Sequence, residues 1–187
     1  VKPSDTYKFL IITSPSGVYY KEPIKVKVET HYARACDGGT GSAKAAGNYA
    51  ASLYPAKLGQ QKVYQQLIWT DAKEHKYIEE SGTMNVMFVI GDAVVTPALH
   101  DSILAGITRN SILTIARHWG IKVEERQISV DEIIEAQKKG MLKEAYRNLT
   151  KAMLLNPNKY TIYNNLGAVL EKNNNYDSAI QMLEIGI

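Results

Sequence analysis

The hydrophobic pattern of this chain changes its period near residue 130, and that change limits the folds the sequence can adopt. Before that point, short apolar runs alternate with polar residues or stop at glycine and proline, as β-strands do; they cover residues 7–13, 24–28, 67–69, 77–78, 86–90, 93–95 and 123–128. From Asp131 onward, the apolar residues follow the period of an α-helix. Strands that precede helices along the chain predict an α+β fold.

Two local signals add detail to this plan. Gly91-Asp92 separates two apolar runs and predicts a tight hairpin, which Pro97 ends because proline has no backbone N–H to donate. A helix is then expected to begin at Thr108, a suitable capping residue, and to stop at Gly120. Its buried face is expected to carry Ile112, Ile115, Ala116 and Trp119.

The helical tail shows an internal repeat. Residues 34 positions apart match, with Pro157 between the two copies: Ala145 with Ala179, Leu149 with Leu183, and Ala152 with Gly186. Tyr163, Leu166 and Gly167 open the second copy. The pattern resembles the tetratricopeptide repeat, a pair of antiparallel helices with small residues at their crossing. About one and a half units are present, fewer than such arrays usually need, and an ordinary helical hairpin remains the alternative.

Composition excludes several classes of function. The net charge of +3 over 187 residues is too small to indicate a nucleic acid or an anionic membrane as partner. The single cysteine, Cys36, excludes an internal disulfide, and the four scattered histidines do not predict a metal site. No apolar run of about 18 residues predicts a transmembrane helix, and no signal peptide follows Val1. These features favour a cytoplasmic protein, and the start at Val1 suggests a fragment.

The most informative stretch is GGTGSAKAAGNY at residues 38–49, in which small residues surround Lys44. Small neighbours let a bulky ligand approach the amine and keep it poorly hydrated, and a desolvated lysine is a nucleophile that can form a Schiff base. A phosphate-binding P-loop is excluded because Ala43 replaces its second glycine and Ala45 replaces its magnesium-binding hydroxyl. A Gly/Ala-rich turn with a surface lysine remains an alternative.

Four segments, taken in order, resemble branched-chain amino-acid aminotransferases, which are fold-type-IV pyridoxal-phosphate enzymes. They are GSAKAAGNYAAS at 41–52, YIEESGTMN at 77–85, TP at 96–97 and SILAGITR at 102–109. The resemblance covers about residues 3–146. It implies an incomplete α+β large domain, a pseudo-barrel of strands with helices, followed here by a helical-hairpin tail. D-amino-acid transaminases and aminodeoxychorismate lyases share the fold and the lysine, and the Gly-Thr-Met sequence at 82–84 favours the branched-chain group.

The resemblance also implies a cofactor site for pyridoxal 5′-phosphate. Lys44 would form the Schiff base and then move the α-proton, and Tyr49 would hydrogen-bond the phenolic oxygen of the cofactor. Glu80 would face the pyridine nitrogen and keep it protonated. Ile107 and Thr108 would bind the phosphate at a helix N-terminus.

Two further residues would contact the substrate, Thr83 near its carboxylate and Tyr19 along its side chain. Each assignment has a structural alternative. Glu80 could be one of two exposed acids with Glu79. Thr108 could simply cap its helix, and Tyr19 could be an ordinary aromatic residue of a strand. Met84, Met87 and Phe88 are more typical of a core than of a cofactor contact.

The sequence departs from the family at both ends. The family's smaller N-terminal domain has no counterpart, and RNLT at residues 147–150 replaces a Gly-Thr-rich turn that holds phosphate and substrate. We therefore expect an aminotransferase-like cofactor domain at residues 1–140 and repeat-like helices at 141–187, as a fragment or fusion with weak cofactor binding and impaired turnover.

The expected function is amino-group transfer from leucine, isoleucine or valine to 2-oxoglutarate. The alternative is a non-catalytic helical-repeat interaction module on a decayed enzyme domain. Small amino acids and 2-oxo acids are the expected partners. A homodimer, and a protein or peptide bound through residues 141–187, remain open.

Overall fold

The first sheet forms around a buried tryptophan. In the computed structural model, which describes residues 2–185, its strands are β1 (Val26–Val28), β2 (Gln66–Thr70), β3 (Ile78–Ser81) and β4 (Met84–Asn85), in that order across the sheet. β1 runs parallel to β2, and the remaining neighbours are antiparallel. Trp69 on β2 is buried, and its indole N–H donates to the carbonyl oxygen of Gly82 at 2.9 Å. This bond fixes the turn between β3 and β4 against the sheet.

The second sheet contains the hairpin predicted at Gly91-Asp92. It pairs β5 (Phe88–Ile90) with β6 (Ala93–Thr96) in antiparallel register, and β7 (Lys122–Glu125) adds to β6 in parallel. Gly91 has a φ of +64°, which glycine adopts without strain and which the tight turn requires. β6 ends at Thr96, so the predicted end of the hairpin before Pro97 is confirmed. On the side of β7, one further backbone bond follows the proline, from the Ala98 N–H to the carbonyl oxygen of Arg126 at 3.2 Å.

The α2 helix (Ile107–His118) packs against β7, and its stop at Gly120 agrees with the prediction. The predicted buried face is partly wrong. Ala116 is buried together with Arg109 and Leu113, whereas Ile112, Ile115 and Trp119 are exposed. Residues 109, 113 and 116 follow the helical period, and the direction from which the sheet approaches decides which apolar residues are covered.

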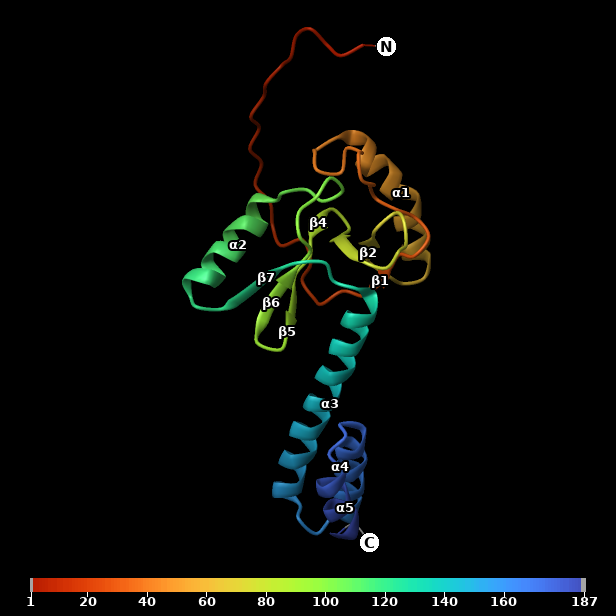
Figure 1. Ribbon diagram of the computed structural model, residues 1–187, viewed down its shortest axis with the longest axis vertical. Helices are drawn as coiled ribbons and strands as arrows, with labels where there is room; N and C mark the ends of the chain where they lie inside the picture. Colours follow the sequence, from red (N-terminus) through yellow and green to blue (C-terminus); the bar gives the residue numbers. More distant parts are fainter. Residues whose placement is uncertain (1, 186–187) are drawn as a thin grey trace.

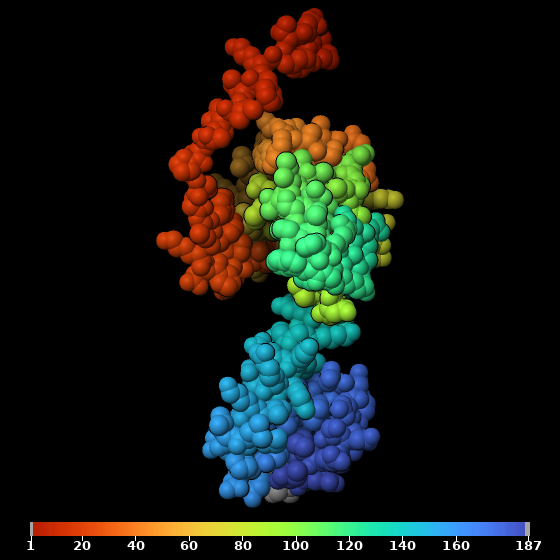
Figure 2. Space-filling model, turned by 90° about the vertical axis from the view of Figure 1, so that its left-hand side faces the viewer, coloured from red at the N-terminus to blue at the C-terminus, as the bar shows by residue number. Residues whose placement is uncertain are grey.

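The predicted strand at residues 7–13 is absent. Residues 2–25 form no strand, and the large side chains from Tyr7 to Ile12 are exposed; Phe9, for example, is 86% exposed. Figure 2 shows this N-terminal segment standing away from the body. A strand needs hydrogen bonds to a neighbour, and no segment within residues 2–185 supplies them to residues 7–13. Local β propensity alone is therefore insufficient here.

The C-terminal third is helical, as its apolar period predicts. A long helix, α3 (Val130–Leu155), leads away from the sheets to the antiparallel helices α4 (Tyr160–Lys172) and α5 (Tyr176–Ile185) (Figure 1). Ser129 caps α3 by accepting a hydrogen bond from the backbone N–H of Glu132. α3 continues without a break through residues 140 and 141, where the sequence predicts a domain boundary.

A small apolar cluster holds this tail together. Its buried members are Leu166, Leu170 and Ala179, and the side chains packed around them are Leu149, Met153 and Met182. A Cβ added to Gly167 would lie 2.7 Å from Cγ of Leu183, so a small residue is needed where α4 meets α5. The repeat pair of Ala152 with Gly186 lies partly outside the described residues, and the tetratricopeptide assignment remains a prediction.

Among residues 2–185, no helix combines the length and the apolar character needed to cross a membrane.

Candidate active site

A cavity of about 870 Å³ lies between the lysine loop, the β3–β4 turn and the start of α2. Its lining brings together residues that are far apart in the sequence, including Lys44, Glu80, Thr83, Ile107 and Thr108. Each of these was singled out as a candidate from the sequence. The cavity therefore holds an amine, a carboxylate and a helix N-terminus together.

The loop that carries Lys44 is held by the side chain of Asn48 on α1 (Ala46–Gln61). Asn48 is buried, and its amide nitrogen donates to the carbonyl oxygens of Thr40 at 2.7 Å and Ala43 at 3.0 Å. Its amide oxygen accepts from the Thr40 hydroxyl at 2.8 Å. A single buried amide thus provides hydrogen-bond partners for the turns that precede Lys44, and it fixes the position of the lysine backbone.

Gly41 brings this loop into direct contact with a second loop. A Cβ at position 41 would lie 2.5 Å from Cα of Ser102 and 2.6 Å from Cβ of Ala35. The backbone N–H of Ser42 donates to the carbonyl oxygen of Asp101 at 2.8 Å across the same contact. Only glycine allows the two backbones to approach this closely.

We expect Gly41→Ala to destabilise the protein by about 1–3 kcal/mol, because the added methyl group overlaps backbone atoms that cannot rotate away. Gly47→Ala is the matched control, since a Cβ there meets nothing within 4 Å and helix α1 gains propensity. Urea unfolding followed by circular dichroism measures both. Equal stabilities for the two variants would contradict the close approach.

Lys44 lies at the edge of the cavity and is exposed. The sequence predicted a desolvated amine, and this expectation is wrong for the structure because the small residues around Lys44 leave its side chain uncovered. Tyr49, one turn into α1, stands beside it, with Nζ 5.7 Å from the ring centroid. Tyr49 therefore lies beside the lysine, but it does not line the cavity.

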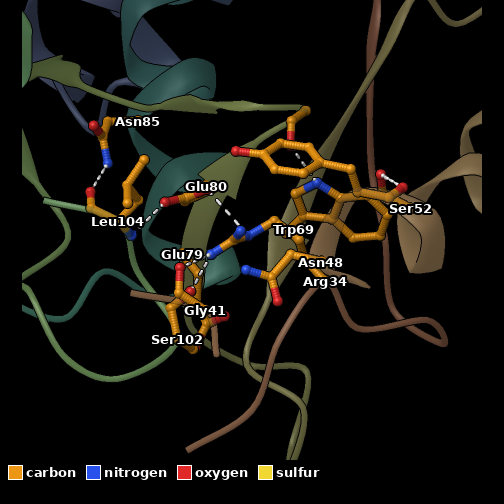
Figure 3. A network of polar contacts seen from close by, with 12 residues as sticks. Arg34, Gly41, Asn48, Ser52, Trp69, Glu79, Glu80, Asn85, Ser102 and Leu104 are labelled. Atoms are coloured by element: carbon orange, nitrogen blue, oxygen red, sulfur yellow. Dashed lines mark hydrogen bonds and ion pairs between the residues drawn. The ribbon is translucent and has the colours of Figure 1, made fainter. Parts of the chain in front are cut away.

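Glu80 on β3 is only 2% exposed. One carboxylate oxygen, Oε1, accepts from the backbone N–H of Leu104 at 2.8 Å, and the other, Oε2, lies 3.0 Å from Nε of Arg34 (Figure 3). Burial raises the pKa of Glu80 above its usual range, and the Leu104 N–H and the Arg34 guanidinium oppose that rise. The buried carboxylate is thus held by one backbone hydrogen bond and one ion pair.

Glu79 is buried too, on the opposite face of the strand. Its Oε1 accepts from the hydroxyl of Ser102 at 2.5 Å, and it lines a separate cavity of about 510 Å³ beside His100. Burial raises the pKa of Glu79 as well, against the hydrogen bond from Ser102. The alternative of two exposed acids is therefore wrong. Alternation along β3 sends the two carboxylates into different cavities.

The N-terminus of α2 offers free backbone donors to the first cavity. Gly106 is the capping residue, with extended backbone and no side-chain cap. The prediction that Thr108 caps the helix is thus wrong, because Thr108 lies inside the first turn. The N–H groups of Ile107 and Thr108 have no acceptor within the helix, and the helix dipole adds positive potential there. This arrangement suits an anion such as a phosphate.

The two predicted substrate residues lie in different places. Thr83 lines the cavity from the β3–β4 turn. Tyr19 is 81% exposed and stacks edge-on against Tyr20 beside α1, in a separate depression of about 520 Å³. The structure therefore brings Thr83 to Lys44 and Glu80, and it does not bring Tyr19 there.

Sequence reasoning missed three residues that hold the site. Arg34 contacts Glu80, Asn48 fixes the lysine loop, and Asn85 donates to the carbonyl oxygen of Leu104 at 2.8 Å. The signal for Asn48 was its place inside the lysine motif. No local pattern marks Arg34, because its partners lie at least seven positions away along the chain. Within residues 2–185, no cluster of acids, histidines and cysteine suits a metal ion.

Comparison with known proteins identifies relatives for most of this chain. The family model described as amino-transferase class IV matches residues 2–141. Branched-chain-amino-acid aminotransferase 2 of Bacillus subtilis is 51% identical over 157 residues, which cover 82% of this chain and 43% of that protein. The branched-chain-amino-acid aminotransferase of Mycobacterium tuberculosis is 44% identical, covering 82% of this chain and 44% of its own. The chain therefore spans less than half the length of the relatives it matches.

Solved structures give the same result at the level of the fold. A branched-chain aminotransferase of Thermoproteus uzoniensis, crystallised with norvaline, superposes with a TM-score of 0.58 at 30% identity. The superposed part is 64% of this chain and 40% of the archaeal chain. The Escherichia coli branched-chain aminotransferase superposes with a TM-score of 0.53 at 32% identity, covering 58% and 35%.

Proposed function

Because the chain belongs to the class IV aminotransferase family, we propose that it carries the cofactor-binding part of a branched-chain amino-acid transaminase. The reaction transfers the amino group of leucine, isoleucine or valine to 2-oxoglutarate, and the cofactor is pyridoxal 5′-phosphate. The proposed cofactor domain is residues 1–140, and the proposed repeat-like helices are residues 141–187. The observation that carries the proposal is the single cavity shared by Lys44, Glu80 and the N-terminus of α2.

The residues present fit this cofactor. When bound, pyridoxal phosphate supplies an aldehyde that takes up an amino group and a ring that withdraws electrons. The uncapped amide N–H groups of Ile107 and Thr108 would bind its phosphate. The Glu80 carboxylate would keep a proton on the ring nitrogen, and the hydroxyl of Tyr49 would orient the phenolic oxygen.

The chain's own groups also handle the proton and the substrate. The Lys44 amine would be the nucleophile that binds the cofactor, and its Nζ would move the α-proton of the substrate. Thr83 would bind the substrate carboxylate from the β3–β4 turn. Tyr19 lies in a separate depression and is not part of this proposed site. Cytoplasmic location is part of the same proposal.

We propose that the affinity for the cofactor is low. The basic side chains that line the cavity within residues 2–185 are Lys44 and Arg109. Nη2 of Arg109 is already engaged by the carbonyl oxygen of Pro97 at 2.8 Å and by Glu125 at 2.9 Å. Nε of Arg109 is buried without a hydrogen-bond partner. The other donors proposed for the phosphate are the backbone N–H groups of Ile107 and Thr108, each worth roughly 1.5–3 kcal/mol when charge-assisted.

Reductive trapping tests the proposed function. The full chain is incubated with pyridoxal phosphate, reduced with borohydride and digested, and the labelled lysine is mapped by mass spectrometry. We expect the label at Lys44, because that amine adjoins both the anion at Glu80 and the phosphate donors. A label spread over surface lysines in proportion to their exposure would contradict the assignment.

A second candidate function is protein binding by the tail. A depression of about 470 Å³ lies between α3 and α4, and it is lined by Lys138, Met141, Leu142, Ala145, Ala168, Val169 and Lys172. Met141 is 64% exposed. A mostly apolar hollow on paired helices favours a helical partner, and we propose a second copy of this chain as that partner.

Sedimentation of the full chain tests self-association through this face. A mass of two chains that falls to one in Met141→Glu supports it, because the added charge cannot be desolvated in an apolar contact. A single-chain mass at every concentration, or a dimer that Met141→Glu does not disturb, argues against it.

A further inference from the structure

Arg34 occupies the point where the lysine loop, β3 and the loop before α2 meet. It is 7% exposed, which is rare for arginine unless the guanidinium is paired. Its Nη2 donates to the carbonyl oxygen of Gly41 at 3.2 Å and to that of Ser102 (Figure 3). Arg34 therefore joins two loops that are 61 positions apart in the sequence.

The same guanidinium contacts the carboxylate of Glu80. Nε of Arg34 lies 3.0 Å from Oε2, yet this N–H has no acceptor in hydrogen-bonding geometry. The contact is thus an ion pair that approaches the carboxylate obliquely. With Oε1 bound by the Leu104 N–H, each oxygen of Glu80 has a single protein partner and keeps lone-pair capacity for a donor in the cavity.

Few other groups can support a negative charge at Glu80. The charges that act on Glu80 are those of Arg34, Glu79 and Lys44. Arg109 lines the same cavity but is paired with Glu125. Glu79 repels a second carboxylate, and Lys44 is exposed, so water screens its charge. Arg34 is the buried cation at this place, and an unpaired buried carboxylate would take up a proton instead.

We propose that Arg34 is a positioning residue, which holds Glu80 as an anion aimed into the cavity and ties that anion to the lysine loop. The anchor at Gly41 lies three residues before Lys44, so one side chain sets the spacing between the carboxylate and the amine. The inference rests on the proposed function only where it names the cofactor's ring nitrogen as the group that the Glu80 carboxylate would contact.

Titration of Glu80 in the cofactor-free full chain tests the proposal. Carboxyl carbons of glutamate are labelled with ¹³C, and the Glu80 signal is assigned by its loss in Glu80→Gln. In Arg34→Gln we expect the midpoint of the Glu80 pH titration to rise by about one pH unit or more, which is a tenfold gain in proton affinity. The reason is that an opposite charge at contact distance is removed. Arg34→Lys keeps the charge without the planar fork, and its midpoint should fall between the two.

Arg117→Gln is the matched control, because it also removes an arginine–carboxylate pair, with Glu125, but at the surface. It should leave the midpoint of Glu80 unchanged. A midpoint that does not move in Arg34→Gln, or that moves as far in Arg117→Gln, overturns the proposal.

The wild-type chain gives a second measurement if Arg34→Gln does not fold. The ¹⁵Nε signal of Arg34 should shift with the same midpoint as the Glu80 carboxyl, because the two atoms are 3.0 Å apart. An Arg34 signal that ignores this midpoint overturns the proposal. Neither measurement involves the cofactor. A failure here with successful trapping at Lys44 rejects only the role of Arg34, and a failure of trapping alone rejects the proposed function.

Discussion

Replacing Lys44 by alanine is expected to abolish covalent retention of pyridoxal phosphate and to slow amino transfer by roughly 10³-fold or more. The methyl group of alanine can neither attack an aldehyde nor carry a proton. Among residues 2–185, no other lysine lines the cavity. The measurement is the fraction of chains that keep the label after borohydride reduction, together with the rate at which leucine converts the added cofactor to its amine form.

Lys57→Ala supplies the control. Lys57 is an exposed lysine on α1, the helix that follows Lys44, and it does not line the cavity. Its removal should change neither the label nor the rate. If Lys44→Ala retained wild-type labelling while Lys57→Ala lost it, the nucleophile would have to be sought elsewhere on the chain.

Exchanging Glu80 for glutamine is expected to slow the half-reaction with leucine by about 10²-fold or more, equivalent to about 2.7 kcal/mol of barrier. Glutamine keeps the size of the side chain but carries no charge, so it cannot keep the ring nitrogen protonated. Single-turnover absorbance measurements follow the reaction. Thermal unfolding is recorded in parallel, because the exchange also leaves Arg34 buried without its anion.

Glu79→Gln is a close control for this exchange. Glu79 is the neighbouring residue, equally buried, yet its carboxylate faces Ser102 and the other cavity. We expect its rate to stay within a few-fold of wild type. Equal slowing of both variants would indicate a general loss of structure on β3 and would contradict a specific role for Glu80.

The pH dependence gives Glu80 a further signature. Burial raises the pKa of Glu80, opposed by the Leu104 N–H and by Arg34, while Glu79 adds to the rise and Lys44 opposes it. The carboxylate is present above this raised pKa and is lost as the pH falls through it. The wild-type rate should therefore decline on the acid side, and that limb should be missing in Glu80→Gln. An identical acid limb in both would assign it to another group.

Local patterns predicted the parts of this fold that depend on near neighbours. Gly91 supplies the positive φ of a tight turn, so the hairpin of β5 and β6 is encoded within nine residues. The period of the apolar residues after Asp131 likewise specifies helix, because it depends on side chains three and four positions apart. Residues 7–13 have the apolar pattern of a strand but no neighbouring strand to pair with, so the same reasoning predicted a strand that does not form.

The sequence by itself determined the family, the lysine motif and the hairpin of β5 and β6 followed by α2, since each is written in contiguous residues. It did not predict helix α1. Only the tertiary structure decided that Glu79 and Glu80 are buried in different cavities, that Gly106 caps α2, and that Arg34 reaches Glu80. These outcomes depend on which loops cross and which strands pair across dozens of residues. Desolvation and charge pairing at such crossings are properties of distance in space, and the local sequence does not specify that distance.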